Sequence, residues 1–450
     1  MVDHRVRQIF ATRTTTQGDD LFGHYELLPP LAPLHLAPIK RVALLTESFL
    51  PKVDGVSKTS YLTVRYLQET GRDVLIFAPD SAVPQVGNSE VVNLPSFSMP
   101  AATETRVALP MPLIAQRLEA FQPDLIHLAS PAFMTVAGMA MGRELNVPIV
   151  ANYQTDLPGY ASHYGWNIME QPTRKWLRYI HNGCHVNLVP SQTIKRDLQG
   201  HRFRRMRVWG RGVNLERFNP AHYSATMRAR LLAGRDPDAL LCIYVGRLAN
   251  EKSVDLLREV ADVAGVALTI IGDGHSREYL EDVFAGTGTH FTGYMYKDDL
   301  ATAFASADVF CFAGANETFG QVVQEAMASG LPTVVTDRGS VKDLVRDSET
   351  GFVVDHTPSA FADAARTLQN DRNLLQQMSY NARARAETRP WWAIMQELET
   401  YYHEAVALNQ RFTQRYGWTN YHQPWALGTR IQHWMQQFDA YLPRPTQEGS

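Results

Sequence analysis

The stretch NETFGQVVQEAMASGLPTVV, residues 316–335, is typical of a helix followed directly by a buried strand. Thr318 followed by Gln321 predicts a capping box at the start of the helix. Gly330 stands where a residue in the left-handed conformation ends a helix, and the proline two positions later prevents its continuation. We therefore expect a helix from about Thr318 to Ser329, and then a short strand, as one step of an α/β sheet.

Two glutamates in this stretch point to an extended ligand. Glu317 and Glu325 stand eight positions apart, which corresponds to about 12 Å along a helix axis. The paired carboxylates of glycoside hydrolases lie about 5 to 9.5 Å apart, so this spacing disfavours that class. The backbone N–H groups of Phe319, Gly320 and Gln321 at the helix start are suited to bind a phosphate. A polar ring near Glu317 and a polyol ring near Glu325 would complete the layout of a nucleotide sugar.

The composition is that of an ordinary soluble chain, with 450 residues, 45% hydrophobic and 20% charged. The net charge of −3 does not suggest a general nucleic-acid binder. The three cysteines lie in unrelated apolar contexts, so we expect buried, reduced thiols in a cytoplasmic protein. Residues 1–40 contain no apolar segment typical of a signal peptide, and we expect no transmembrane helix.

Two successive series of strand and helix patterns predict two parallel-sheet domains. The first begins with RVALLT and DVLIFAP on either side of a helical stretch, and the second runs from LLCIYVG to LPTVVT. Ligands of such sheets bind beyond the carboxyl ends of the strands, so a cleft between the domains is the expected site. The predicted parts are an extended lead-in, 1–39, two domains, 40–208 and 209–390, and a C-terminal helix with an aromatic-rich tail, 391–450.

The tail has an unusual composition, because five of the eight tryptophans lie between residues 391 and 434. An apolar stripe recurs there at helical spacing from Ile431 to Phe438. We expect this stripe to dock onto the protein's own surface. Insertion into a membrane interface is the alternative, although the polar face is nearly uncharged.

A second motif, LLCIYVGRLANEK, ends its strand with Gly246, Arg247 and, after a short loop, Lys252. One arginine and one lysine at this spacing suit two oxygens of a diphosphate, Arg247 as a bidentate donor and Lys252 as a point charge. Solvated surface cations near a turn are the alternative interpretation.

Glycines near other strand and helix ends add weaker signals. Gly55 follows Asp54 just before a helix start at Ser57, which allows close approach of the backbone to a phosphate. Gly272 and Asp273 end another strand in a similar way.

Together these motifs resemble the retaining glycosyltransferases of family 4. The resemblance covers roughly residues 41–390 and rests on GRLANEK, IGDG, TGYMYKDDL and ETFGQVVQEAMASGLP. ESFLPKVDGVS, HLASPA, YQTDLPGYASHYG and WGRGVNLERF are most similar to the bacterial GDP-mannose-dependent alpha-mannosyltransferases that build glycolipids, and sulfoquinovosyl-diacylglycerol synthases are similar relatives. The resemblance implies the α/β GT-B fold, in which two Rossmann-like doubly wound domains face each other across a cleft.

The resemblance also implies roles for matching residues. Arg247 and Lys252 would neutralise the leaving diphosphate, and Glu317 would hold the sugar, so these three form the expected catalytic set. Glu325 would bind the ribose hydroxyls, and the backbone of residues 294–296 would meet the base. The expected donor-binding residues are Gly55, Gly246, Gly272, Asp273, Met295, Thr318, Phe319, Gly320 and Glu325.

The acceptor side is expected around His127, Gln154 and Asp156. Many family members carry a histidine where this chain has Gln154, and glutamine cannot act as a general base. Asp156 is the nearest titratable alternative, unless the departing phosphate takes the acceptor's proton. His127 could equally be a structural hydrogen-bonding residue. The scheme needs no metal or other cofactor.

The function expected from these residues is transfer of a hexose, with mannose from GDP-mannose as the leading donor, to a lipid or glycan acceptor with retention. A diacylglycerol glycosyltransferase that uses UDP-sulfoquinovose or UDP-glucose is the first alternative. A non-catalytic lipid-surface protein on a degenerate transferase fold is the second, and the joint presence of the four charged motif residues disfavours it.

The basic segment 195–207 is either a solvated edge or a contact with anionic lipid. Because lipid acceptors lie in a membrane, we expect a cytoplasmic protein that is peripheral on the inner face of the cell membrane. The expected partners are the donor, the acceptor and this membrane surface, without nucleic acid.

Overall fold

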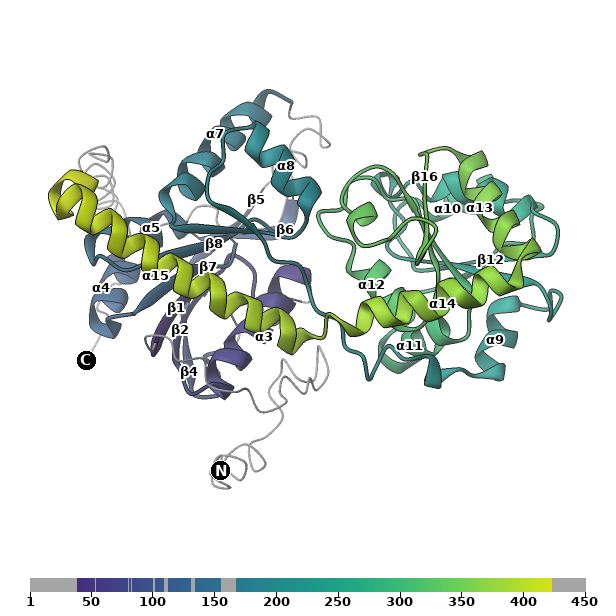
Figure 1. Ribbon diagram of the computed structural model, residues 1–450, viewed down its shortest axis with the longest axis horizontal. Helices are drawn as coiled ribbons and strands as arrows, with labels where there is room; N and C mark the ends of the chain where they lie inside the picture. The colour runs from purple at the N-terminus through teal and green to yellow at the C-terminus, as the bar shows by residue number, and fades with distance from the viewer. Residues whose placement is uncertain are drawn as a thin grey trace, which may run out of the picture. The chain divides into compact units, whose positions relative to one another are not determined.

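The computed structural model describes residues 39–52, 54–79, 81, 83–99, 102–108, 112–130, 134–154 and 167–422. None of the helices within these ranges combines the length and the apolar character that crossing a membrane requires. The chain divides into two compact units (Figure 1). The first takes its described residues from Met1–Val189, Leu198–Arg207 and Glu397–Ser450, and the second consists of Pro190–Asp197 and Val208–Gln396.

The first unit is built on an eight-stranded sheet with the order β10-β9-β8-β7-β1-β2-β4-β3. Its strands are β1 Arg41–Leu45, β2 Asp73–Pro79, β3 Gln85–Val86, β4 Ser89–Leu94, β7 Leu125–Leu128, β8 Ile149–Asn152, β9 Val186–Val189 and β10 Met206–Val208. The helices of this unit are α3 Gly55–Glu69, α4 Pro112–Phe121, α5 Thr135–Glu144 and α7 Asn167–Gly183, and the helices α8 Gln192–Gly200 and α15 Trp391–His422 are divided between the two units. A separate two-stranded sheet joins β5 Ser96–Met99 to β6 Ala102–Ala108.

The centre of this sheet is parallel because helices connect successive strands. β1 pairs in parallel with β2 on one side and with β7 on the other. Four of the five β1 residues are buried, which fits the continuous apolar run of a strand covered on both faces. The strand order reverses between β1 and β7, so the sheet is doubly wound.

Helix α15 returns to the first unit and packs there through an apolar stripe. Leu398, Tyr402 and Ala405 are buried at helical spacing. The helix begins at Trp391, where the sequence predicted a C-terminal helix, and from Glu397 onward it is part of the first unit. A helix with such a stripe must bury it. The predicted stripe at 431–438 lies outside the described residues.

The second unit contains a six-stranded sheet with the order β13-β12-β11-β14-β15-β16. Its strands are β11 Leu240–Val245, β12 Val266–Ile271, β13 His290–Gly293, β14 Val309–Phe312, β15 Thr333–Thr336 and β16 Gly351–Val354. Its helices are α9 Ala225–Leu232, α10 Arg277–Val283, α11 Lys297–Ala305, α12 Gln321–Ala328, α13 Pro358–Asn370 and α14 Arg372–Glu387. Short 3-10 turns are η1 Pro220–His222, η2 Asn250–Lys252, η3 Val254–Asp262 and η4 Val341–Asp343.

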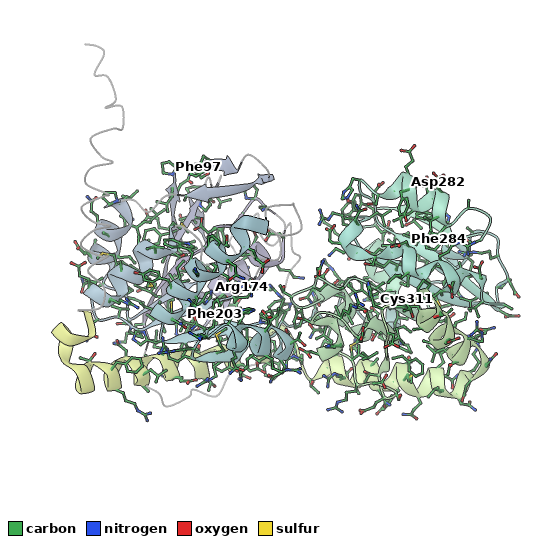
Figure 2. The ribbon with its side chains drawn as sticks, turned by 90° about the horizontal axis from the view of Figure 1, so that it is seen from above. Phe97, Arg174, Phe203, Asp282, Phe284 and Cys311 are labelled. Atoms are coloured by element: carbon green, nitrogen blue, oxygen red, sulfur yellow. The ribbon has the colours of Figure 1, made fainter. Side chains whose placement is uncertain are left out.

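The paired strands of this sheet are all parallel, and their side chains form one core. Cys311 and Phe284, labelled in Figure 2, belong to that core. All three cysteines are buried and free, as the sequence predicted.

The division between the units differs in detail from the predicted boundary at 208/209. Residues 190–197 group with the second unit, because Thr193 donates its backbone N–H to Asp343 at 2.7 Å and Ser191 donates its hydroxyl to Ser340 at 2.9 Å.

Candidate functional site

The candidate site of the second unit lies where its strand order reverses. Strands β12 and β13 follow β11 on one side of the sheet, and β15 and β16 follow β14 on the other side. The switch point therefore lies between the paired strands β11 and β14. Ligands of doubly wound sheets bind beyond the carboxyl ends of the strands at this point. The loop after β11 carries Arg247 and Lys252, and the loop after β14 carries Glu317. The expected catalytic set therefore comes from these two adjacent loops.

Lys252 and Glu317 form an ion pair between these loops, with the lysine Nζ on the glutamate Oε1. The lysine side chain reaches Glu317 past Gly314. A Cβ atom at position 314 would lie 3.6 Å from Lys252 Cδ and 2.9 Å from the ring of Phe312. Glycine at 314 thus avoids a clash with the Phe312 ring, whereas a Cβ atom there would make only an ordinary contact with the lysine stem.

Arg247 has its own carboxylate partner, which the sequence analysis missed. Its Nη2 donates to Glu251 Oε1 at 2.5 Å, an i,i+4 pair within the same loop. The Arg247 side chain is 49% exposed and that of Glu251 only 17%. The i,i+4 spacing in GRLANEK was the signal that could have revealed this pair.

Tyr244 is a second residue that sequence reasoning missed. Its hydroxyl donates to the backbone carbonyl of Arg247 at 3.2 Å, and its ring stacks on Phe312 with centroids 5.9 Å apart. A Cβ atom at Gly246 would lie 2.6 Å from this hydroxyl oxygen. Burial raises the pKa of Tyr244, and the neighbouring carboxylates Glu317 and Glu251 raise it further. The residue was overlooked because a tyrosine inside an apolar strand is usually read as part of the core.

Gly272 and its neighbours support the cation-bearing loop. The φ angle of Gly272 is +142°, and a Cβ atom there would lie 1.9 Å from the carbonyl oxygen of Gly246. The N–H of Leu248 donates to the carbonyl of Asp273 at 2.9 Å. A Cβ atom on Gly274 would lie 2.2 Å from the carbonyl oxygen of Leu248. The IGDG loop therefore packs backbone to backbone against the GRLANEK loop, which only glycines permit.

The carboxylate of Asp273 is engaged locally. It accepts the N–H of Gly274 at 2.7 Å and a guanidinium N–H of Arg277 at 2.9 Å. The hydrogen bond from Gly274 and then the one from Arg277 lower the pKa of Asp273 below its usual value. In the structure Gly272 and Asp273 thus support the loop, and their contact with a donor stays a prediction.

The predicted capping box at Thr318 is wrong. Helix α12 begins at Gln321, and its N-cap residue is Gly320, in the left-handed conformation at φ +89° and without a side-chain cap. Gln321 is the first residue of the helix rather than the third, and its Nε2 donates to the carbonyl of Gly212 at 3.0 Å. The estimate of about 12 Å for a fully helical rise from Glu317 no longer applies, since the residues before 321 are not helical. The predicted glycine C-terminus is confirmed, with Gly330 at φ +80°.

The other expected donor residues have different surroundings. Glu325 is half-buried on α12, and Thr318 is half-buried in the loop before it. Phe319 is buried, with its ring 3.2 Å from where a Cβ atom on Gly210 would lie. Met295 is 7% exposed, so its side chain belongs to the core. Their contacts with a donor stay predictions.

In the first unit, Asp54 caps helix α3 and Gly55 is the first helical residue. Asp54 accepts the N–H of Ser57 at 2.7 Å and the hydroxyl of Ser48 at 2.8 Å. Burial alone would raise the pKa of Asp54, but these hydrogen bonds and Lys52 hold it below its usual value. Asp54 therefore stays ionised at the helix start, and the approach of Gly55 to a phosphate stays a prediction.

His127 is a structural residue rather than an open acceptor-side group. It is fully buried in β7, where its Nδ1 lies 2.7 Å from the hydroxyl of Tyr402 and its Nε2 lies 2.9 Å from Asn152 Oδ1. Burial lowers the pKa of His127 to about 4. The expectation of an acceptor-side role is therefore corrected: its ring nitrogens hold α15 and β8 against β7.

Gln154 donates its side-chain N–H to the carbonyl of Ala129 at 2.7 Å, so it links the ends of β8 and β7. This hydrogen-bonding role agrees with its inability to act as a base. Asp156 lies outside the described residues.

Within the described ranges, no group of three or more His, Cys, Asp or Glu residues could hold a metal ion. The DxD sequence at Asp236 and Asp238 forms a turn before β11, in which the N–H of Asp238 donates to Asp236 Oδ1 at 2.9 Å. That catalysis needs no metal stays a prediction.

Two family models match the chain. Residues 53–217 match Glycosyltransferase Family 4, and residues 233–385 match Glycosyl transferases group 1. A GDP-mannose-dependent alpha-mannosyltransferase of Mycobacterium tuberculosis is 38% identical over 384 residues, which are 83% of this chain and 98% of the relative. Sulfoquinovosyl transferase SQD2 of Arabidopsis thaliana is 35% identical over 81% of this chain and 74% of its own length.

Solved structures show the same architecture. A sucrose-phosphate synthase from Thermosynechococcus elongatus matches with a TM-score of 0.65 and 20% identity, covering 82% of this chain and 99% of that protein. Anabaena HepE in complex with UDP and glucose matches with a TM-score of 0.62 and 18% identity over 80% of this chain and 99% of that protein. These likenesses show the GT-B fold. With the family models and the near full-length relatives, they show that this chain is a glycosyltransferase enzyme of family 4.

Proposed function

We propose that this enzyme moves mannose from GDP-mannose to a lipid or glycan acceptor, with retention of configuration at the anomeric carbon. The observation that carries the proposal is the Lys252–Glu317 pair beside Arg247 at the switch point of the second sheet. The 38% identity to a GDP-mannose-dependent alpha-mannosyltransferase supports the choice of donor.

In the proposed mechanism the bond between the anomeric carbon and the diphosphate oxygen breaks first, and negative charge develops on the leaving group. Arg247 and Lys252 stabilise this charge, and such preorganised stabilisation is usually the largest single contribution to catalysis. Glu317, with two carboxylate oxygens, accepts hydrogen bonds from the sugar hydroxyls.

The acceptor hydroxyl then attacks from the face that the diphosphate leaves, and its proton passes to the departing phosphate oxygen. This route produces retention and needs no protein base at Gln154. It also agrees with the position of His127, which is buried away from solvent.

Similarity to two other transferases supports a second class of donor. The 35% identity to a sulfoquinovosyl transferase, and 24% identity to an alpha-monoglucosyldiacylglycerol synthase of Streptococcus pneumoniae, support UDP-sulfoquinovose or UDP-glucose with a diacylglycerol acceptor. The same cations would serve either donor, because the diphosphate is common to both.

A thermal-shift titration with GDP, UDP, ADP and their sugar conjugates separates these candidates. A nucleotide at about 100 times its Kd adds about 2.7 kcal/mol to the free energy of unfolding. Stabilisation by GDP and GDP-mannose is the expected result. A response to UDP alone would favour the second donor class, and no response to any nucleotide would contradict both.

We also propose peripheral contact with an anionic membrane at its cytoplasmic face, where a lipid acceptor would be reached. Part of the basic segment 195–207 serves the fold instead, because Arg205 donates to backbone carbonyls and Arg207 pairs with a glutamate of α15. Arg202 and Arg204 are exposed and remain available.

Co-sedimentation with vesicles tests this contact. Each well-placed cation contributes about 1 kcal/mol, so the double variant Arg202→Glu and Arg204→Glu should weaken binding to anionic vesicles about tenfold or more. Arg366→Glu, on the second unit, is the control. Equal binding of the unaltered protein to neutral and anionic vesicles would overturn the proposal.

A further inference from the structure

The loop of residues 315–320, which we call the Glu317 loop, packs against the turn η4. Ser340, directly before η4, donates its backbone N–H to the carbonyl of Glu317 at 3.2 Å. Gly339 comes so close to the same loop that a Cβ atom on it would lie 2.1 Å from the carbonyl oxygen of Ala315. Because these contacts join backbone to backbone, rotation of a side chain cannot absorb a shift of η4. The position of Glu317 therefore depends on the position of η4.

The same turn also holds residues 190–197. Asp343, the last residue of η4, accepts the backbone N–H of Thr193 at 2.7 Å and its hydroxyl at 3.1 Å. Ser191 donates its hydroxyl to Ser340 at 2.9 Å, and both serines are buried. Residues 190–197 belong to the second unit but continue at both ends into residues of the first. Turn η4 thus connects the Glu317 loop to the part of the chain that leads into the other unit.

The carboxylate of Asp343 is the main attachment between η4 and helix α8. Its side chain is only 18% exposed, and it meets the N-terminus of the helix, where a negative charge is stabilised. Arg196 lies 3.9 Å away, but its side chain is 71% exposed, so this ion pair contributes little. A separate contact holds η4 from α14, because Arg385 donates to the carbonyl of Leu344 at 2.7 Å. Loss of the Asp343 carboxylate should therefore loosen η4 without unfolding it.

We propose that Asp343 is a positioning residue for Glu317. Through η4 it ties the Glu317 loop to the start of α8, and so fixes the place at which the Glu317 carboxylate meets the hydroxyls of the transferred sugar. Arg247 stands on a different loop, after β11, so the attachment acts on the sugar more than on the nucleotide. The inference rests on the proposed function, since it needs Glu317 to contact the sugar of the donor.

Asp343→Ala tests the proposal by separating turnover from binding. We expect kcat with GDP-mannose to fall about 10- to 100-fold, because a misplacement of about 1 Å can cost 10²-fold in rate. The Kd for GDP, which has no sugar, should stay the same in titration calorimetry. Asp343→Asn keeps an oxygen that can accept the N–H of Thr193, so it should restore most of the kcat.

Asp371→Ala is the matched control, because it removes a similar contact elsewhere in the second unit. Asp371 caps helix α14 by accepting the N–H of Leu374 at 2.9 Å. The next residue, Arg372, donates to the carbonyl of Asp238 just before β11, so Asp371 lies near the amino ends of the strands, opposite the candidate site. This variant should lose a similar amount of thermal stability but keep its kcat.

Hydrogen exchange gives a second readout that needs no substrate. The backbone amides of residues 315–320 and of Ser340 should exchange faster in Asp343→Ala than in the unaltered protein, and Asp371→Ala should leave them unchanged.

An unchanged kcat in folded Asp343→Ala would overturn the proposal, and so would unchanged exchange. Weaker binding of GDP that matches the fall in kcat would overturn it as well, because that pattern indicates general damage to the site. If the unaltered enzyme does not use GDP-mannose, the proposed function is contradicted, and hydrogen exchange alone then decides whether Asp343 holds the Glu317 loop.

Discussion

At the scale of single residues, the candidate site is a set of balanced charges. Arg247 lies beside Glu251, and Lys252 lies beside Glu317. A diphosphate must therefore compete with two carboxylates for the two cations. If Lys252 turned to a phosphate oxygen, as we propose, Glu317 would become available to the hydroxyls of the transferred sugar, so one exchange would prepare both parts of the donor.

Lys252→Ala is expected to lower kcat by roughly 10²- to 10³-fold, the cost of removing one preorganised charge from a leaving group. We expect the variant to be folded, with a Tm close to that of the unaltered enzyme in thermal unfolding, but slow in transfer. Arg366→Ala is the control, because the Arg366–Asp363 pair is exposed and such pairs contribute about 0 to 1 kcal/mol. An unchanged kcat in folded Lys252→Ala would remove Lys252 from the mechanism.

Tyr244→Phe removes only the hydroxyl that holds the carbonyl of Arg247. We expect a stability loss of about 1 kcal/mol, the usual contribution of one hydrogen bond, and a higher KM for the donor because the Arg247 loop is less well fixed. Steady-state kinetics and urea unfolding measure the two effects. A KM equal to that of the unaltered enzyme would show that Tyr244 serves packing alone.

The motif residues were predictable because their spacing is local. Arg247, Lys252 and Glu317 could be assigned from short stretches that end strands. Tyr244 and His127 could not, because a tyrosine or histidine inside an apolar strand gives no sign of which partner its polar atom will meet. For His127 that partner is Tyr402, far along the chain on α15.

At the scale of secondary-structure elements, α15 is held to the first unit by buried polar contacts as well as by its apolar stripe. The guanidinium of Arg72 pairs with Glu399 at 2.7 Å, and these side chains are only 15% and 6% exposed. Arg207 and Glu404 pair one turn further on, with side chains 40% and 29% exposed. Helix α15 thus forms one buried and one more exposed ion pair with the first unit.

Glu399→Ala should destabilise the protein by about 3 to 5 kcal/mol, since removing one partner of a buried pair leaves the other charge uncompensated. Glu404→Ala, on the same helix, should cost about 1 kcal/mol or less. Equilibrium unfolding in urea gives both values. Equal losses in the two variants would contradict the assignment of the first pair as buried.

Buried histidines of the first unit predict a loss of stability in acid. Burial lowers the pKa of His127 and His181 to about 4 and that of His185 to about 3, from a usual value of 6.5. Between about pH 6.5 and pH 4 the unfolded chain binds more protons than the folded one, so stability is complete above this window and falls within it. The slope approaches about 1.4 kcal/mol per pH unit for each histidine.

The Tm should therefore fall steadily from about pH 7 to about pH 4.5. His127→Gln keeps a polar side chain beside Tyr402 and Asn152 and should reduce the slope. A Tm that stays constant over this range would contradict the burial of neutral histidines.

The start of α12 shows why element boundaries are hard to predict. Thr318 and Gln321 have the spacing of a capping box, but Gly320 adopts a left-handed conformation and the helix begins after it. A side chain at 320 would meet Val341 Cγ1 at 2.7 Å, so the close approach of a distant loop fixes this turn. Tertiary packing of that kind has no local signature.

At the scale of the whole molecule, the two doubly wound sheets follow from the alternating strand and helix patterns. Each of the longer apolar runs became a parallel strand, because such runs are buried on both faces. The β5–β6 hairpin was not predicted, and Phe97 on it is 49% exposed (Figure 2).

Transfer should be independent of divalent metal, because in the proposed mechanism Arg247 and Lys252 would supply the positive charge that a metal would otherwise provide. We expect the same initial rate with EDTA in excess as without it, measured as sugar transferred from the donor. A rate that falls with EDTA and returns with Mg²⁺ or Mn²⁺ would contradict a mechanism based on these cations alone.

The most direct test of the central claim is transfer of labelled mannose from GDP-mannose to a bacterial lipid extract, with the anomeric configuration of the purified product read by NMR. We predict an α-linked mannolipid, formed by the unaltered enzyme and nearly absent with Lys252→Ala. A β-linked product, or transfer from a UDP-sugar but not from GDP-mannose, would contradict it.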